Sequence, residues 1–155
     1  MTAFFRAPVR LQRGLVYTAA LLRALTNARQ RALVREALTL ARQLPQRLEQ
    51  PLPEALAGLT PPVVPQPLPE TTIRQIVDAL TAFGAGRPLG ICLRRSLLRY
   101  YFLRRAGLPL VIHFGARRQG DAIGGHAWLT RQDQPYHEQP QNILTHTEMW
   151  RFPTT

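Results

Sequence analysis

The chain has 155 residues, 45% hydrophobic and 19% charged, which is typical of an ordinary globular domain, and no apolar run approaches the roughly 18 residues of a membrane span. Its net charge of +11 favours an anionic partner, but the arginines are spread along the chain, which argues against nucleic-acid binding as the main function. A single cysteine excludes an intramolecular disulfide and fits a reducing compartment, so we expect a cytoplasmic protein without stable membrane insertion.

Helical periodicity dominates residues 8–48, where the pattern predicts two helices with Asn27 as the N-cap between them. The expected inner faces are Leu11, Leu15, Ala19 and Leu22 in the first helix, and Leu33, Ala37, Leu40 and Leu44 in the second. Prolines crowd residues 45–69 and predict an extended connector, because proline fixes φ and lacks an amide hydrogen. We therefore expect an N-terminal helical extension (residues 1–48), a proline-rich connector (residues 49–69) and a catalytic core (residues 70–155).

The core begins with a helix that includes Ile73 and ends after Phe83, followed by a second helix that carries Cys92 and stops at Gly107. The hydrophobic period then changes from 3.6 to 2 over residues 108–117 and 125–132, and a third short strand is predicted around residues 136–139. Helices followed by antiparallel strands predict an α+β fold.

The single thiol, Cys92, lies in the first turn of its predicted helix. The helix dipole stabilises negative charge there, and a neighbouring imidazolium lowers a thiol pKa further, so this position suits a nucleophile. The simpler alternative is that Cys92 is a small buried hydrophobic residue. His126, in a strand that two glycines introduce, is the candidate base, although His113, His137 and His146 compete with it. No metal-ligand spacing is present, so we expect neither a zinc site nor a cofactor.

A third residue is needed to orient the imidazole. If residues 126–130 and 135–139 form a hairpin centred on Gln132, His126 faces Glu138 directly, and opposed side chains in such a pair are close enough to hydrogen-bond. A shift of one residue would turn Glu138 to the other face. Asp133 is expected in the turn, and Asp121, just before the strand, is the weaker alternative.

Four motifs in this region resemble those of the lasso peptide B proteins, specifically their transglutaminase-like cysteine protease domain. They are Cys-Leu-x-Arg-Ser at residues 92–96, Leu-Arg-Arg-x-Gly at 103–107, Gly-x-Arg at 115–117 and His-Ala-Trp at 126–128. The resemblance covers residues 85–140 and implies a papain-like fold with the nucleophile helix packed on an antiparallel sheet. It places Cys92, His126 and Glu138 in a catalytic triad, with glutamate where the family most often has aspartate.

The resemblance also implies an activity and partners. Proteins of this family are thiol proteases, that is hydrolases, that remove the leader from a ribosomally made precursor during lasso peptide biosynthesis, a form of RiPP maturation. A separate ATP-dependent cyclase then closes the macrolactam. Some members carry a winged-helix leader-binding domain with three strands before its helices, and residues 1–69 do not show that pattern. The chain therefore resembles the stand-alone leader peptidase of a split system, working with a separate leader-binding recognition protein.

Two other functions remain open at this stage. A transglutaminase or acyltransferase would use the same three residues with an amine in place of water as the acceptor, and mass spectrometry of the products would distinguish it. A non-catalytic scaffold that delivers the precursor to the cyclase would keep its function when Cys92 is replaced.

Overall fold

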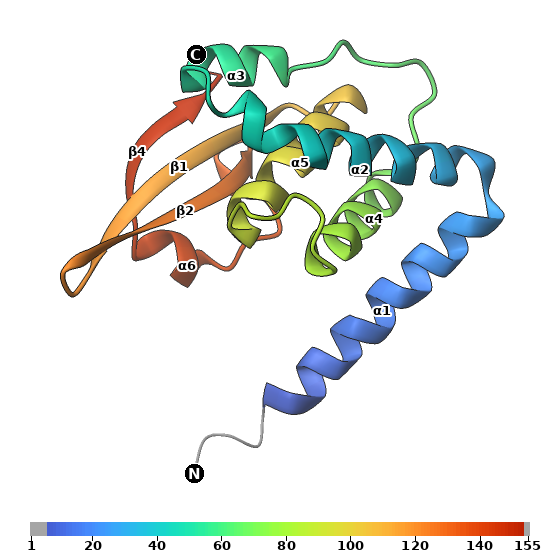
Figure 1. The fold of residues 1–155 in the computed structure, drawn as a ribbon, viewed down its shortest axis with the longest axis horizontal. Helices are drawn as coiled ribbons and strands as arrows, with labels where there is room; N and C mark the ends of the chain where they lie inside the picture. Colours follow the sequence, from blue (N-terminus) through green and yellow to red (C-terminus); the bar gives the residue numbers. More distant parts are fainter. Residues whose placement is uncertain (1–5, 154–155) are drawn as a thin grey trace.

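The computed structural model describes residues 6–153 of the chain, and side chains from residue 14 onward (Figure 1). Within this range the helices are α1 (Arg6–Thr26), α2 (Ala28–Arg47), α3 (Leu52–Gly58), α4 (Glu70–Ala82), α5 (Ile91–Arg105) and α6 (Pro140–Leu144). The strands are β1 (Leu110–Gln119), β2 (Ala122–Arg131), β3 (Gln134–Pro135) and β4 (Thr147–Phe152). They form one antiparallel sheet in the order β3-β2-β1-β4. The predicted α+β fold is confirmed.

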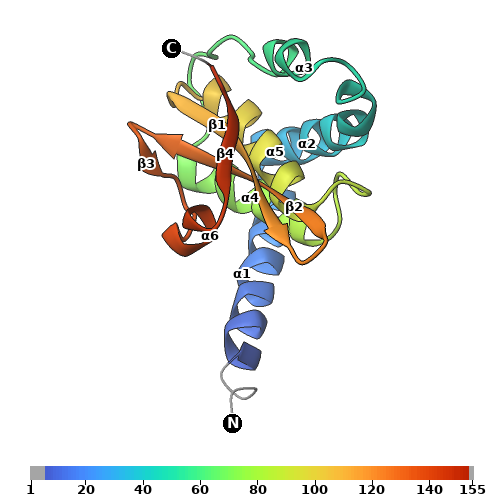
Figure 2. The same cartoon turned by 90° about the vertical axis from the view of Figure 1, so that its left-hand side faces the viewer.

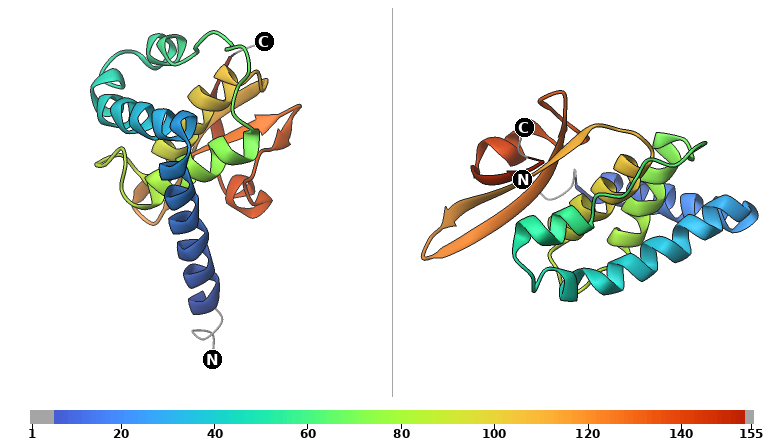
Figure 3. Two further views of the ribbon diagram at one scale, coloured as in Figure 1. Left: turned by 90° about the vertical axis from the view of Figure 1, so that its right-hand side faces the viewer. Right: turned by 90° about the horizontal axis from the view of Figure 1, so that it is seen from above.

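The nucleophile helix α5 packs on the sheet through contacts with β1 and β2, and α4 packs against α5. Seen from above, α2, α4 and α5 lie on the same side of the sheet (Figure 3, right). α5 ends as the sequence predicts, because Gly107 adopts a positive φ of 91° that L side chains rarely take. The expected cap between the first two helices is also present, since the side chain of Asn27 accepts hydrogen bonds from the amides of Arg29 and Gln30.

One hydrophobic core joins the helices that precede α4 to the sheet. Its fully buried members include Leu44 on α2, Leu56 on α3, Leu97 on α5 and Ile112 on β1. Burying a leucine or isoleucine side chain contributes about 1.5–3 kcal/mol to the free energy of folding. α2 and α3 therefore share the core of the helix that carries Cys92.

The buried face of α1 is not the predicted one. Leu15 and Leu22 are 65% and 60% exposed, whereas Ala20 and Ala24 are buried. α1 packs against α4, and the two small alanines, one helical turn apart, allow the helices to approach closely. Leu11 lies outside the described side chains. Figure 2 shows the N-terminal half of α1 extending away from the body of the protein, and none of the described helices is long and apolar enough to cross a bilayer.

The connector is only partly extended, which corrects the prediction for residues 49–69. Its first part forms α3, with Pro53 in the first helical turn, where proline is tolerated because the amides there have no intrahelical acceptor. The remainder runs as an extended strap, and the amide of Val64 donates to the carbonyl of Arg105 over 3.0 Å. Prolines therefore mark both the start of a helix and an extended segment here.

The hairpin after β2 has a register one residue different from the predicted one. Gln132 and Asp133 both have positive φ, 51° and 60°, and form a two-residue turn that pairs Arg131 with Gln134. β3 then ends at Pro135, so the predicted strand over residues 136–139 is wrong: these residues form a loop. α6 and β4, which follow this loop, were not predicted from the sequence. β4 pairs with β1 at the edge of the sheet.

Candidate active site

Cys92 is the second residue of α5, directly after Ile91. Its partly buried thiol lies beside the backbone amides of Leu93 and Ala127, and both amides lower its pKa. The first amides of a helix have no intrahelical partner and attract negative charge. The position predicted for Cys92 from the sequence is therefore the one it occupies.

β2 brings His126 to the thiol. Ser96, one turn further along α5, donates a hydrogen bond of 2.9 Å to the carbonyl of Ala127, and both groups are buried. This bond ties the nucleophile helix to the residue that follows His126. Because it is short and buried, it sets the separation between the helix and the strand, and with it the relative position of the two candidate catalytic side chains.

Aromatic rings on both sides hold the imidazole of His126. It stacks on Trp128 with a centroid separation of 5.9 Å and on His146 with one of 5.0 Å. Trp128 fits because Gly115 lies beneath it: a Cβ at that glycine would be 2.8 Å from the indole ring. Trp128 also stacks on His113, so four rings lie in one row. The ring of His126 consequently has little freedom to rotate.

Glu138 approaches His126 from the loop after β3. Its Oε2 lies 3.7 Å from Nε2 of the imidazole, which is an ion-pair contact slightly longer than a hydrogen bond, and Nε2 has no closer polar partner. Asn142 on α6 donates to Oε1 of Glu138 over 2.6 Å. The predicted pairing of these two residues across a hairpin is wrong, because the strand ends before Glu138. The two side chains meet because His137 adopts a positive φ of 50° and redirects the chain.

The pKa values of the three groups describe a thiolate–imidazolium pair. A hydrogen-bonding interaction with His126 is the largest influence on Cys92 and lowers its pKa, although burial acts in the opposite direction. The same interaction, followed by that with Glu138, raises the pKa of His126 to about 9. Burial opposes ionisation of Glu138, but the nearby imidazolium of His126 and the hydrogen bond from Asn142 outweigh it and lower its pKa to about 2. At neutral pH the cleft thus holds a protonated base, whose charge favours the thiolate form of Cys92.

Of the other candidates from the sequence, His137 lines the same cleft and His146 stacks on His126, whereas the remaining ones lie elsewhere. Asp133 is in the turn between β2 and β3, as predicted, and Asp121 is exposed in the turn between β1 and β2. His113 is buried and hydrogen-bonded on both ring nitrogens, to Glu148 over 2.7 Å and to Thr130 over 2.8 Å. No group of three or more His, Cys, Asp or Glu side chains among the described residues is arranged to hold a metal ion.

The three side chains open onto a cavity of about 440 Å³. Besides them, its walls include Tyr17, Arg74, Arg95, Arg99, His137 and Asn142. Of these six residues, His137 had been considered only as a competing base, and the other five were not predicted to be part of the site. Arg95 stands three residues after the cysteine and could have been placed by helical periodicity, but Tyr17 and Arg74 come from α1 and α4, whose position relative to the cleft has no signal in the sequence.

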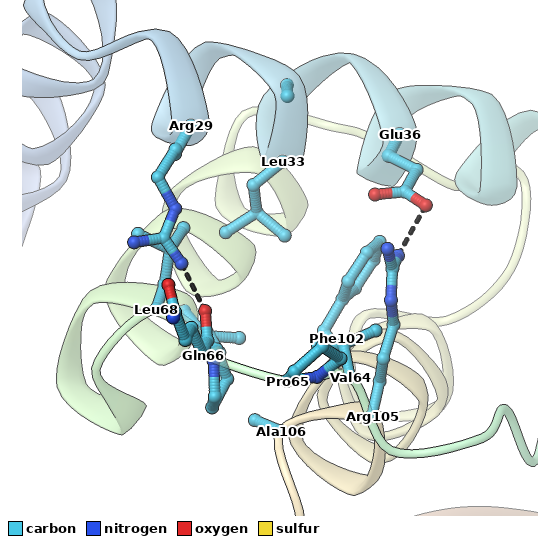
Figure 4. A pocket seen from close by; sticks show the side chains of 13 residues that line it. Arg29, Leu33, Glu36, Val64, Pro65, Gln66, Leu68, Phe102, Arg105 and Ala106 are labelled. Atoms are coloured by element: carbon cyan, nitrogen blue, oxygen red, sulfur yellow. Dashed lines mark hydrogen bonds and ion pairs between the residues drawn. The ribbon is translucent and has the colours of Figure 1, made fainter.

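A second cavity, of about 310 Å³, lies between α2, the extended strap and the C-terminal end of α5 (Figure 4). It is lined mainly by apolar side chains, including Leu33, Val64 and Phe102. Charged groups at its rim are paired: Arg105 binds Glu36, and Arg29 donates to the carbonyl of Gln66. It holds no nucleophile.

Comparison with known proteins identifies the family of the chain. No curated protein and no solved structure matches the chain. The family model of the transglutaminase-like superfamily matches residues 4–151, which include α1, α2 and the connector as well as the cleft. This superfamily includes cysteine proteases and acyltransferases, and its enzymes typically use a cysteine, a histidine and an acidic residue. The expected transglutaminase-like core is confirmed, and the chain belongs to the transglutaminase-like superfamily.

Proposed function

We propose that this protein is a cysteine endopeptidase that removes the leader peptide from a ribosomally made lasso peptide precursor before macrolactam formation. The observation that carries the proposal is the pairing of Cys92, at the start of α5, with the imidazole of His126, whose far nitrogen faces Glu138. The choice of substrate is supported by the four motifs that surround these residues in the sequence.

The geometry suggests how the reaction proceeds. The thiolate of Cys92 attacks the carbonyl at the leader–core junction, and the N-terminal amides of α5 favour the negative charge that develops on the oxygen. The imidazolium of His126 then donates its proton to the departing amine of the core, which leaves the leader as a thioester on Cys92. Neutral His126 next removes a proton from water, which hydrolyses the thioester and releases the leader.

Glu138 acts through the ring of His126 and is a positioning residue. Its carboxylate faces Nε2, so it favours the tautomer that carries a hydrogen there and leaves the other ring nitrogen for the thiol. Asn142 fixes the carboxylate, and the stacked rings of Trp128 and His146 fix the plane of the imidazole. Such supporting contacts matter because small misplacements of a base slow proton transfer strongly.

We further propose two protein partners, a separate leader-binding recognition protein and the ATP-dependent lasso cyclase. A cleft that contacts only a few residues around the cut binds a flexible peptide weakly, since little surface is buried against the cost of ordering it. A protein that holds the distal leader would raise the effective concentration of the junction at Cys92 to about the millimolar range. Cleavage should therefore be slow with this chain alone and faster with the partner.

The test is digestion of a leader–core precursor, with and without the leader-binding protein, followed by mass spectrometry of products and enzyme. We expect a free leader carboxylate, a free core amine, and a transient leader thioester on the protein. Enzyme alkylated at Cys92 with iodoacetamide is the control and should give none of these. Transfer of the leader to an added amine would instead indicate acyl transfer. Unchanged processing by the alkylated enzyme would indicate a scaffold.

A further inference from the structure

Three arginine side chains line the same cavity as Cys92. Arg95 and Arg99 come from α5 and Arg74 from the neighbouring α4. Arg95 is three residues from the cysteine, which places its Cα about 4.5 Å further along the helix axis. Guanidinium groups this close to the nucleophile can contact a substrate that binds in the cleft.

Only one of the three arginines is closely paired. Asp78 is buried beside them, and both of its carboxylate oxygens accept hydrogen bonds of 2.7 Å from Arg99. Arg74 and Arg95 approach the same carboxylate at 3.7 and 3.9 Å, beyond hydrogen-bond distance. Among the described side chains, Arg74 Nε is buried without a hydrogen-bond partner, and Arg95 has one long contact of 3.4 Å with Thr81.

The remaining charges of the cavity do not balance these two cations. Glu138 is the only carboxylate among the lining residues, and it faces His126. His137, which also lines the cavity, is kept neutral, since burial and the charges of Arg74 and Arg99 lower its pKa. The cavity therefore carries two guanidinium groups that lack a full partner among the described side chains.

We propose that Arg74 and Arg95 select substrates with an acidic side chain, aspartate or glutamate, within about two residues of the scissile bond. The identification of the ligand as a peptide rests on the proposed function, whereas the anion preference rests on the arginines alone. A guanidinium binds a carboxylate through two parallel hydrogen bonds, which gives both affinity and orientation. The short spacing between Arg95 and Cys92 limits how far along the peptide that carboxylate can be, because an extended chain advances about 3.4 Å per residue.

The first experiment probes the cleft without any peptide. The rates at which iodoacetate and iodoacetamide alkylate Cys92 are compared, because the two reagents differ in charge and little in size. In Arg74→Gln and Arg95→Gln, we expect the iodoacetate-to-iodoacetamide rate ratio to fall about three- to tenfold at low ionic strength, and less at high salt. Arg42→Gln, on the exposed side of α2, is the matched control and should leave the ratio unchanged. An unchanged ratio in both cleft variants would overturn the proposal.

The second experiment uses paired precursor peptides that differ by glutamate and glutamine near the cut. The native protein should cleave the glutamate peptide with a kcat/KM about tenfold higher, and Arg95→Gln should lose that preference. Arg95→Glu should prefer a lysine peptide instead. Equal rates on both peptides by the native protein would contradict the proposal. If no peptide is cleaved while the alkylation ratio still falls in the variants, the peptidase assignment fails and the anion preference stands.

Discussion

Two cavities of this protein lie at opposite ends of one helix and differ in how the charged groups around them are paired. At the N-terminal end of α5, the cleft leaves Arg74 Nε and His126 Nε2 buried without hydrogen-bond partners. At the C-terminal end, the charged groups around the apolar cavity are paired with a carboxylate or a carbonyl (Figure 4). Unpaired polar groups cost stability, so they persist where they serve chemistry. This difference favours the first cavity as a site of chemistry and the second as part of the packing.

The largest expected effect is that of Cys92→Ala. Cleavage of the precursor should fall by at least about 10³-fold, because no other residue can supply the nucleophile. Thermal stability should stay close to native, since one small side chain replaces another at a partly exposed site. Mass spectrometry and a thermal melt measure the two quantities. The matched control is Asp121→Asn, at an exposed turn, which should leave both unchanged. If Cys92→Ala still cleaves the precursor, this cavity is not the catalytic site.

Glu138→Gln should lower kcat/KM by about 10²-fold, because the imidazole loses the group that orients it. It should also change the pH profile. His126 must be protonated to release the amine, so native activity falls as pH rises through its pKa of about 9. Glu138 raises that pKa, so its replacement should move the alkaline limb to lower pH. Asp133→Asn, in the turn, is the control and should leave the pH profile unchanged. If the alkaline limb of Glu138→Gln stays at the native pH, the positioning role of Glu138 is contradicted.

Gly115→Ala should reduce kcat/KM by about tenfold. The added methyl group would lie 2.8 Å from the Trp128 ring and displace it, which disturbs its stack on His126. The rate at which iodoacetamide alkylates Cys92 reports the same displacement without a substrate. Gly58→Ala provides the comparison, because a Cβ there meets nothing within 4 Å. Equal activity of the two variants would mean that the stack does not orient the base.

Phe102→Ala addresses the second cavity and should have the smallest effect on cleavage. The side chain is buried at the cavity wall, and its loss should reduce the free energy of unfolding by about 3 kcal/mol. Well below the melting temperature, kcat/KM should change less than about twofold, since the residue lies almost three helical turns from Cys92. Denaturant titration and peptide cleavage test both statements. A large loss of activity would show that the two ends of α5 are coupled.

Sequence patterns located those parts of the site that depend on local geometry. The start of α5 at Cys92, the cap at Asn27 and the stop at Gly107 each follow from the backbone preference of one residue. The meeting of His126 with Glu138 was expected for an incorrect reason: a strand register was assumed, whereas a left-handed residue in a loop produces the contact. That conformation is uncommon for residues other than glycine, and the hydrophobic pattern of the sequence does not mark it.

The rest depended on tertiary packing. In α1 both the leucines and the alanines have the spacing expected of a buried helix face. The position of α4 decides which of the two faces is buried. β4 is short and mostly exposed, so the alternation of polar and apolar residues along it is weak. For this reason β4 was not predicted, and neither was α6. The arginines of the cleft come from two helices whose relative rotation no local rule provides. The site was therefore predictable residue by residue along α5 and β2, but not across elements.

The stack of Trp128 on His126 makes the base of this site optically visible. The chain contains two tryptophans, and replacing Trp150 by phenylalanine would leave Trp128 as the only indole emitter. Because a nearby imidazolium quenches indole fluorescence more than a neutral imidazole does, the emission of Trp128 should brighten as His126 loses its proton. His113 also stacks on Trp128, so the titration is made in a variant that carries His113→Gln as well. Its fluorescence would then follow the protonation of the base in the resting protein, without any substrate or label.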